Sequence, residues 1–524
     1  MSGRLRNSNM NDYKLLQLQD AHSCINQRAN IIAVVLEFGL PKTTKGTDCC
    51  CTLRLIDETH HQTGMSVNFF IENAESLPYV AAAGDIIQLS NVTLRTHIQE
   101  VNAVPRLAQL RTHIPEVNAV FYKNTSSFAL YRGNDDDFVP YQGYSKVFIR
   151  HEDKIRISSL RKWLVNFQIP ADSSDFPMLR EIKEGHFNLA GKILHCWEPL
   201  KDNWSVYVWD GTDTPPNAIT SMLEDEINHP LPLQLESVPL PRDVLCTLPT
   251  VGSILRVAFE LPIEKNHLNV FKSGKWVQFI NIRLKVYAGL WYGVFTSHSK
   301  LRHTPNENHL ITERQRLYDD RILLKSGNMP IGSIPQSIDN LPESLRITGN
   351  NSFVTLLLGS FIMDGIFISL WDTQLCLTLT EVNHDRVRHL TLMDVLTHSE
   401  VTAKFKCVVR VVAATPYQAE KFCTPAGKYR MRLTLEDPTA RIHAFVVDED
   451  GETLFDGYPG SLYVKRKLNR LLGVTECDSI VVNDRPRNPP WVSVCIKSYY
   501  VIKTDVWGSR NFRIFDTKIV DSPN

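Results

Sequence analysis

Short runs of alternating apolar and polar residues, separated by turn residues, recur along most of this 524-residue chain. Period-two alternation puts every second side chain on one face of a β-strand, whereas a helix needs apolar residues three and four apart. Tyr429–Glu436 (YRMRLTLE) alternates strictly. The pattern therefore predicts an all-β chain, and its length predicts three or four domains.

The first five predicted strands have a characteristic order. They are Asn30–Glu37, Cys49–Asp57, Met65–Ile71, Gly84–Leu94 and Ser127–Tyr131, with a short crossing at Asn73–Ala83. Three strands, a crossing and two more strands is the order of an OB-fold, a five-stranded Greek-key barrel. We expect this first unit over residues 12–148.

Two further units show similar strand patterns. A second OB-fold is expected over residues 149–296, opened by an amphipathic helix at Arg156–Phe167, and a C-terminal OB-fold over 396–521, with a helix at Ser461–Leu472. Residues 297–395 between them are expected to be a polar linker that carries an apolar insertion. The expected fold is thus three OB-fold barrels with short helices and a polar linker. The expected strands of the two units are Phe187–Leu194, Trp204–Asp210, Ser253–Phe259 and Trp276–Tyr287, and then Ala403–Ala413, Tyr429–Glu436, Ala440–Val447, Trp491–Val501 and Phe512–Val520.

One internal repeat interrupts the first unit. Leu94–Val104 (LRTHIQEVNAV) recurs as Leu110–Val120 (LRTHIPEVNAV), with Gln99 replaced by Pro115. A single short repeat is not a solenoid, which needs three or more units. We interpret it as a tandem duplication that lengthens the connection between the fourth and fifth strands into a hairpin. One copy is expected to suffice for the fold.

Several classes of function find no support in the sequence. No nucleophile elbow, P-loop, HExxH or dinucleotide-binding motif is present, and the 11 cysteines have no spacing typical of zinc sites or disulfides. We therefore predict no catalytic residues, no metal and no cofactor, and a reducing compartment. The apolar stretch Phe353–Leu370 carries Asp364 near its middle, at an insertion cost of about 2.5–3.5 kcal/mol, which disfavours a membrane span.

The loop Lys42–Asp48 between the first two predicted strands has the residue types of a nucleic-acid contact. Lys42 and Lys45 can contact phosphates, and Gly46 lets the backbone approach a ligand. Thr47 and Asp48 supply short hydrogen-bonding groups for base edges. On an OB-fold this loop borders the binding face. The same residues also suit a polar hairpin turn.

A family resemblance adds weight to this loop. KGTDCCCTLRLIDET (Lys45–Thr59) resembles the opening of the first OB-fold in the protection-of-telomeres family, the single-strand telomere-end binders. The resemblance continues in the second unit with VWDGTDTP (Val208–Pro215) and at the C-terminus with PWVSVCIKSYYV (Pro490–Val501). It covers about two-thirds of the chain and is strongest to the plant branch.

The resemblance implies DNA contacts at individual positions. It implies single-strand contacts at Lys45, Thr47 and Asp48 and base stacking on Phe70, although alternation alone leaves open which of Phe69 and Phe70 faces the core. His97, or its copy His113, falls where the family has a stacking aromatic; a surface strand histidine is the alternative. In the second unit Trp204 and Tyr207 are candidate stackers of undetermined facing.

The expected function is binding of single-stranded G-rich telomeric DNA in the nucleus, at the telomere, which caps chromosome ends and regulates the access of telomerase. The expected partners are that DNA, a telomere-capping protein docked on the C-terminal OB-fold, and telomerase; no membrane is expected. Lys+Arg and Asp+Glu both number 57, so charge does not drive DNA binding. Two alternatives stay open: a telomerase-complex accessory protein with weak or no DNA binding, which the neutral charge permits, and a general replication-type single-strand binder.

Overall fold

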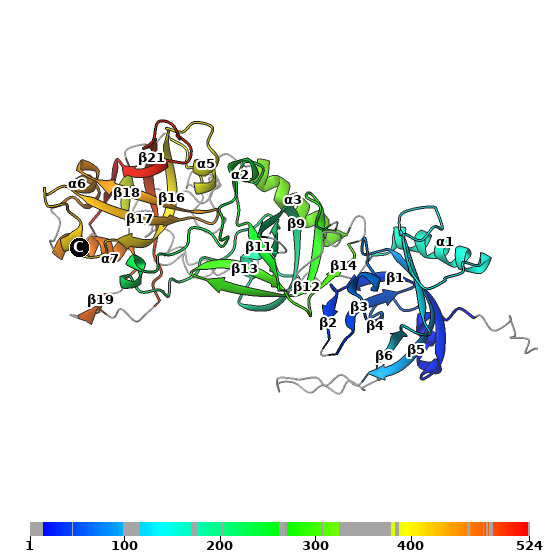
Figure 1. Cartoon of the computed structure of the whole chain (residues 1–524). Coiled ribbons are helices and arrows are strands. Elements are labelled where there is room, and N and C mark those ends of the chain that lie inside the picture. The colour runs from blue at the N-terminus through cyan, green and yellow to red at the C-terminus, as the bar shows by residue number, and fades with distance from the viewer. Residues whose placement is uncertain are drawn as a thin grey trace, which may run out of the picture.

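Three β-barrels follow one another along the chain in the computed structural model (Figure 1). The structure describes residues 14–44, 46–97, 116–168, 176–200, 203–260, 268, 270–304, 308–323, 379–382, 387–457, 462–474, 476–477, 480–481 and 486–521. The predicted all-β class with OB-fold barrels is confirmed by the strand pairing of all three units.

The first barrel closes through five strands. They are β1 (Arg28–Phe38), β3 (Cys49–Ile56), β4 (Met65–Ile71), β5 (Ile86–His97) and β6 (Glu116–Tyr122). The pairing order is β1-β3-β4-β6-β5, β5 pairs back to β1, and β4 runs parallel to β6. Around it lie η1 (Leu18–Cys24), β2 (Lys42–Thr43), η2 (Ala74–Ser76), β7 (Ser127–Tyr131), β8 (Gln142–Tyr144) and α1 (His151–Asn166).

The fifth strand of this barrel differs from the sequence prediction. Ser127–Tyr131, predicted as the fifth strand, is β7, which follows β6 along the same edge of β5 and buries Phe128 and Leu130 in the barrel core. The prediction missed β6, which comes before β7 on this edge, and the first five of its seven residues are the end of the second repeat copy. The first copy supplies the end of β5, so each copy contributes one arm of an antiparallel pair, with His97 opposite Glu116.

Helix α1 belongs to the first barrel in space. The prediction assigned Arg156–Phe167 to the start of the second unit. In the structure Ile157 and Leu160 of α1 are fully buried against Ile32 and Val34 on the outer side of β1. An amphipathic pattern shows that a helix packs on a sheet but not which sheet it packs on, because both barrels present an apolar outer patch.

The second barrel has the same topology. Its strands are β9 (Gly185–Leu200), β10 (Asn203–Trp209), β11 (Leu255–Phe259), β12 (Trp276–Tyr287) and β13 (Leu290–Phe295). β11 and β13 are parallel, and β12 pairs with both β9 and β13 to close the barrel. Its shorter elements are η4 (Leu179–Glu181), η5 (Glu224–Ile227) and α2 (Arg242–Leu245).

The start of the predicted linker is ordered structure. Strand β14 (Lys300–Arg302) and helix α3 (His309–Leu323) both lie within residues 297–395. Arg314 of α3 is 1% exposed and donates hydrogen bonds to the backbone oxygens of Ala190 and Phe176. The polar composition of this segment had suggested a linker, but α3 packs on the second barrel through arginine side chains that are buried and hydrogen-bonded. The apolar insertion Phe353–Leu370 lies outside the described residues.

The third barrel is also closed and five-stranded. Its strands are β16 (Lys404–Thr415), β17 (Arg430–Glu436), β18 (Arg441–Val447), β21 (Trp491–Tyr500) and β22 (Arg510–Phe515), paired in the order β16-β17-β18-β22-β21. Its other elements are β15 (Thr380–Val382), α5 (Leu392–Thr397), η9 (Ala419–Lys421), α6 (Glu449–Phe455), α7 (Leu462–Leu471), β19 (Glu476–Cys477), β20 (Ile480–Val481) and β23 (Thr517–Ile519).

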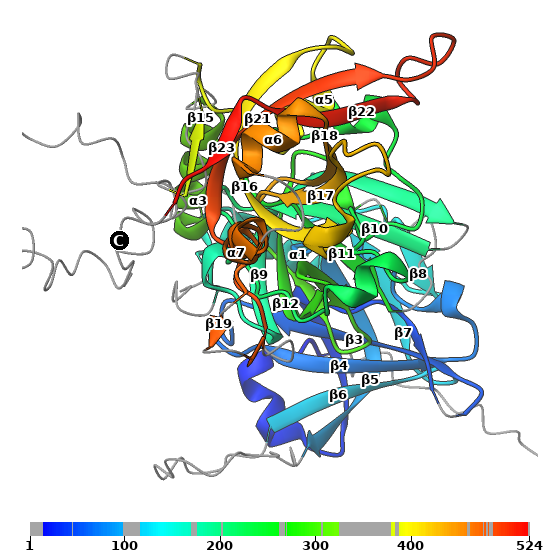
Figure 2. The ribbon, with the colours of Figure 1, turned by 90° about the vertical axis from the view of Figure 1, so that its left-hand side faces the viewer.

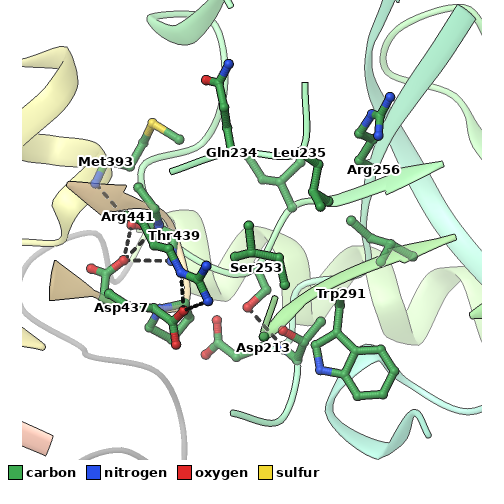
Figure 3. A pocket seen from close by; sticks show the side chains of 18 of the residues that line it. Asp213, Gln234, Leu235, Ser253, Arg256, Trp291, Met393, Asp437, Thr439 and Arg441 are labelled. Atoms are coloured by element: carbon green, nitrogen blue, oxygen red, sulfur yellow. Dashed lines mark hydrogen bonds and ion pairs between the residues drawn. The ribbon is translucent and has the colours of Figure 1, made fainter. Parts of the chain in front are cut away.

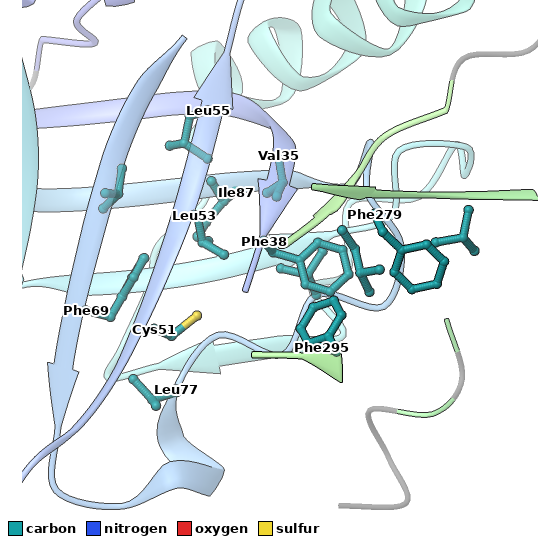
Figure 4. Packing of buried hydrophobic residues seen from close by; sticks show 14 of the residues in the cluster. Val35, Phe38, Cys51, Leu53, Leu55, Phe69, Leu77, Ile87, Phe279 and Phe295 are labelled. Carbon is teal, nitrogen blue, oxygen red and sulfur yellow. The ribbon is translucent and has the colours of Figure 1, made fainter. Parts of the chain in front are cut away.

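Strand β14 joins the first two barrels. Leu301 of β14 pairs with Phe38 of β1 on one side and with Phe279 of β12 on the other. Figure 4 shows Phe38 packed beside Phe279 and Phe295, in a cluster that continues to Leu53 and Phe69 inside the first barrel. The second and third barrels meet through buried Arg441, which donates to the backbone oxygens of Pro232 and Ala288.

Candidate nucleic-acid interface

Two neighbouring aromatic rings project from the outer face of the first barrel. Strand alternation buries Phe69 and Phe121, whose ring centroids lie 5.0 Å apart in the core. Their sequence neighbours therefore point outward: Phe70 is 41% exposed and Tyr122 is 43% exposed. Because β4 and β6 run parallel with Phe70 in register with Tyr122, the two rings lie one strand spacing apart, about 4.8 Å between backbones. Tyr122 was not among the predicted contacts.

The predicted loop Lys42–Asp48 lies beside Phe70. Lys42 pairs with Cys50 of β3, and Cys50 pairs with Phe70 of β4. The loop is closed by Thr44, whose backbone amide and hydroxyl both donate to the carbonyl oxygen of Asp48, at 3.0 and 2.7 Å. These contacts bring one end of the loop and the stacking candidate together on one edge of the barrel.

The individual loop residues have different surroundings. Gly46 and Thr47 are exposed, and the Gly46 amide donates to the Thr44 hydroxyl at 3.2 Å. Lys42 is half-buried and its ammonium donates to the backbone oxygen of Ser297, so it faces the second barrel. Lys45 lies outside the described residues.

A partly exposed network of ion pairs flanks the two rings. Lys123 follows Tyr122 directly, and its ammonium lies 3.2 Å from Asp48 and 2.5 Å from Glu72. The hydrogen bonds to Glu72 and Asp48 raise the pKa of Lys123, which keeps it charged. Asp48 therefore forms an ion pair with the lysine that directly follows β6. The only sequence signal for this contact is a basic residue next to an outward-pointing aromatic residue.

The histidine predicted as a stacker belongs to a position far from Phe70 along the strands. His97 ends β5 opposite Glu116, at the start of β6, whereas Phe70 lies opposite Tyr122 at the end of β6. Glu116 and Tyr122 are six positions apart along β6, which corresponds to roughly 20 Å between their backbones. His113 lies outside the described residues. The outer face of these strands therefore has Phe70 and Tyr122 at one end. At its other end the Arg54 guanidinium lies 3.3 Å from the Glu116 carboxylate.

The corresponding face of the second barrel is covered by its own chain. Tyr207 is only 4% exposed, and its hydroxyl donates to Glu236 at 2.8 Å. Arg256 holds the same carboxylate at 3.3 Å. Burial beside Glu236 raises the pKa of Tyr207. The segment carrying Glu236 covers the Tyr207 ring in this arrangement, so base stacking on Tyr207 stays a prediction. Trp204, three residues earlier on β10, is half-buried.

A cavity of about 780 Å³ lies between the second and third barrels. Figure 3 shows Trp291 and Arg256 on its second-barrel side and Asp437, Thr439 and Arg441 on its third-barrel side. Its charged groups are largely held within the chain, since Asp437 accepts from the backbone amides of Leu392, Thr439 and Ala440. Burial nevertheless raises the pKa of Asp437 to about 6.

Neither metal ligation nor membrane insertion is indicated within the described ranges. No group of three or more His, Cys, Asp or Glu side chains there is arranged to hold a metal ion. No helix among the same residues is long and apolar enough to cross a bilayer.

Comparison with known proteins gives a consistent result. Residues 9–173 match the family model for "Telomeric single stranded DNA binding POT1/CDC13", and residues 375–505 match that for a "POT1A-like, OB fold domain". Two Arabidopsis thaliana relatives, protection of telomeres proteins 1b and 1a, are each 33% identical to this chain, with 97% of this chain and 98% of each relative covered. Among solved structures, fission yeast Pot1 with single-stranded DNA covers 59% of this chain and 95% of its own at 16% identity, with a TM-score of 0.25.

Proposed function

The chain belongs to the protection-of-telomeres family, and we propose on that basis that it binds single-stranded G-rich telomeric DNA and caps chromosome ends. The observation that carries the proposal is the exposed pair Phe70 and Tyr122, on the unit that matches the telomeric single-strand-binding model. Binding, not catalysis, is the proposed activity.

Base stacking supplies most of the affinity in this proposal. Phe70 and Tyr122 offer adjacent rings to successive bases, and each stacked base contributes about 1–3 kcal/mol without any need for net charge. Residues 1–148 contain 13 Lys and Arg against 14 Asp and Glu, so phosphate contacts add little. Exposed Thr47 and the hydrogen-bonded pair Thr52 and Asn68, at 2.9 Å, supply polar groups for base edges.

The biological consequence we propose is sequestration. A DNA 3′ end whose bases are splayed on this face is withheld from repair enzymes, and its release regulates the access of telomerase. Family membership implies a chromosome-end location, and we propose the nucleus as its compartment. We propose that a telomere-capping protein docks on the third barrel.

A second candidate function is that of a telomerase accessory protein with weak DNA binding. The specific observation in its favour is that both Asp48 and Glu72 neutralise Lys123, the lysine next to Tyr122. Under this alternative the rings of Phe70 and Tyr122 would contact protein instead of bases.

A titration with three oligonucleotides tests the proposal. The full chain is mixed with G-rich telomeric, complementary C-rich and shuffled G-rich strands, and binding is followed by fluorescence anisotropy at one fixed salt concentration. We expect the telomeric strand to bind at least about tenfold more tightly than the shuffled strand. Equal affinities would indicate a general single-strand binder, and no binding together with capture of active telomerase would indicate the accessory role.

A further inference from the structure

The outer face of the third barrel carries a row of cations with an aromatic ring among them. Strand pairing places one residue from each strand in register around the outside of this closed barrel. In pairing order they are Arg432 of β17, Phe445 of β18, Arg513 of β22, Lys497 of β21 and Lys404 of β16. Figure 2 looks at this end of the molecule and shows β17 and β18 turned toward the viewer.

Strand alternation settles the direction in which the row points. The neighbours of these residues along their strands, such as Leu433, Ala444 and Ile496, are fully buried in the third core. The members of the row are therefore on the outside. The side chains of Arg432, Arg513 and Lys497 remain 28%, 25% and 33% exposed.

The cations of this face exceed its carboxylates. Asp450 lies 3.2 Å from Lys497 and 2.5 Å from Arg513, and Glu226 lies 3.8 Å from Arg432. Lys404 and Arg430, the latter one outward position along β17 from Arg432, are exposed. Within the described part of the chain, no carboxylate lies within ion-pair distance of either. Beside the rings of the first barrel the balance is reversed, because two carboxylates, Asp48 and Glu72, neutralise one lysine, Lys123.

Packing in the core does not account for an aromatic residue at position 445. It is half-buried on the outside of the barrel and contributes to none of the hydrophobic clusters formed by the described residues. The register sets Arg432 on one side of it and Arg513 on the other. A ring between two guanidinium groups suits a base stacked on the ring with its flanking phosphates on the cations.

Phe445 also occupies a position like that of Phe70. Each lies on the third strand of its barrel, pointing outward, beside the second strand. The face formed by the second and third strands is where OB-folds bind oligonucleotides. Two independent features, charge and strand position, therefore indicate the same ligand.

We propose that the outside of the third barrel, from β17 through β18, β22 and β21 to β16, is a further binding surface for single-stranded DNA. A base stacks on Phe445, and Arg430, Arg432 and Lys404 contact phosphates on either side. The choice of DNA over other polyanions rests on the proposed function, since the first barrel would hold the same strand.

The test uses the full chain with three substitutions on this face, Phe445→Ala, Arg430→Gln and Lys404→Gln. The matched control is Lys465→Gln with Arg466→Gln, which removes the same charge from exposed positions of α7. Affinity is measured for a short telomeric strand of about 10 nucleotides, which one barrel can cover, and for a long strand of about 40 nucleotides.

For the face variant we expect long-strand affinity to fall about 5- to 150-fold while short-strand affinity stays unchanged. The slope of log K against log salt should become shallower by about 1.4, because two phosphate contacts are lost. The α7 control should change neither quantity. The same fall should occur in a chain that also carries Phe70→Ala and Tyr122→Ala.

Other outcomes overturn the inference. If the wild-type chain binds the short strand but the face variant binds the long strand like wild type, the third-barrel surface is refuted and the proposed function survives. If the wild-type chain binds neither strand, both fail together. If an acidic peptide competes at this face and the long strand does not, the surface is a protein-docking site.

Discussion

Stacking on Phe70 and Tyr122 can be separated from general damage to the barrel, because both rings are exposed and neither contributes to the core. We expect Phe70→Ala or Tyr122→Ala to weaken telomeric-strand binding by about 1–3 kcal/mol each, whereas Tyr122→Phe, which keeps the ring, should bind nearly like wild type. Tyr287→Ala removes a ring that is 60% exposed on the second barrel and serves as the matched control. Anisotropy titrations with melting curves on the same samples measure both properties. Unchanged affinity in both folded alanine variants would remove these rings from the site.

The carboxylate of Glu72 is expected to restrain DNA binding. It forms an ion pair with Lys123, which lies beside the rings of Phe70 and Tyr122. Glu72→Gln should therefore leave Lys123 freer to contact a phosphate. We expect an affinity gain of about two- to fivefold at low salt and a salt slope steeper by about 0.7. Glu75→Gln removes an equal charge nearby, from an exposed position that forms no ion pair with Lys123. An equal gain in both variants would mean that bulk charge, not the release of Lys123, is responsible.

Two histidines of the third barrel should make its stability depend on pH. Burial lowers the pKa of His389 and of His443 to about 4, with smaller contributions from Lys406 and Arg432. Since the unfolded chain takes up these protons near pH 6.5, stability contributed by the neutral histidines is present above pH 6.5 and is lost as the pH falls toward 4, by up to about 1.4 kcal/mol per pH unit for each histidine. Asp437, whose pKa is raised to about 6, acts in the opposite direction, because its protonated form is favoured by folding.

The measurement therefore compares variants at each pH. Wild type and a His389→Gln, His443→Gln variant are melted between pH 7 and pH 5. The loss of thermal stability toward pH 5 should be smaller in the variant than in wild type. Parallel pH profiles would show that these histidines do not titrate as proposed.

At the level of elements, strong alternation predicted strands well and pairing partners poorly. Met65–Ile71 and Trp276–Tyr287 form strands with the predicted bounds, because long alternating runs bury one face in any barrel. Ser127–Tyr131 alternates equally well, yet it pairs with β5 and β8, whereas Glu116–Tyr122 pairs with β4 as well as β5. Alternation carries no information on which strand becomes the neighbour. Lys123 illustrates the same limit at the site, since its two carboxylates lie 75 and 51 residues away in sequence.

The repeat gives a prediction at this scale. Deleting Leu94–Gln109 leaves one copy, which must supply both the end of β5 and the start of β6. With the observed register, only Ile114 and Pro115 would then connect the strands. Two-residue hairpin loops require positive φ at one or both positions, which neither residue adopts easily. We expect the variant to fold but to melt a few degrees lower, equivalent to about 1 kcal/mol.

A second deletion separates turn strain from any contribution of the duplicated segment itself. Removing Val101–Leu110 shortens the connection but keeps both strand arms and eight connecting residues. Its stability should equal or exceed that of wild type, because loop closure costs only about 0.6 kcal/mol per doubling of length. DNA affinity should be retained in both variants. Unfolding of this second variant would show that the deleted residues are integral to the barrel.

At the scale of the whole molecule, the connection between the first two barrels depends on a strand that composition had assigned to a linker. Arg302 of β14 reaches the carboxylate of Glu37 on β1 at 2.6 Å, with Lys300 3.7 Å from the same group. Glu37 is only 2% exposed. A buried carboxylate cannot lose its main cation without a large penalty, so this ion pair couples β14 to the first barrel.

Arg302→Met should therefore destabilise the junction by about 3–5 kcal/mol, because it leaves the Glu37 charge buried with only Lys300 nearby. Glu37→Gln combined with Arg302→Met should recover most of that loss, since no uncompensated charge remains. Calorimetry should show the first barrel of the single variant melting at a lower temperature, separately from the second barrel, and hydrogen exchange should accelerate in β1 and β14. Phe38 and Leu301 still pack across the junction in both variants, so a strand with buried apolar residues is present in each. If the double variant is as unstable as the single one, packing at β14, and not the ion pair, holds the two barrels together.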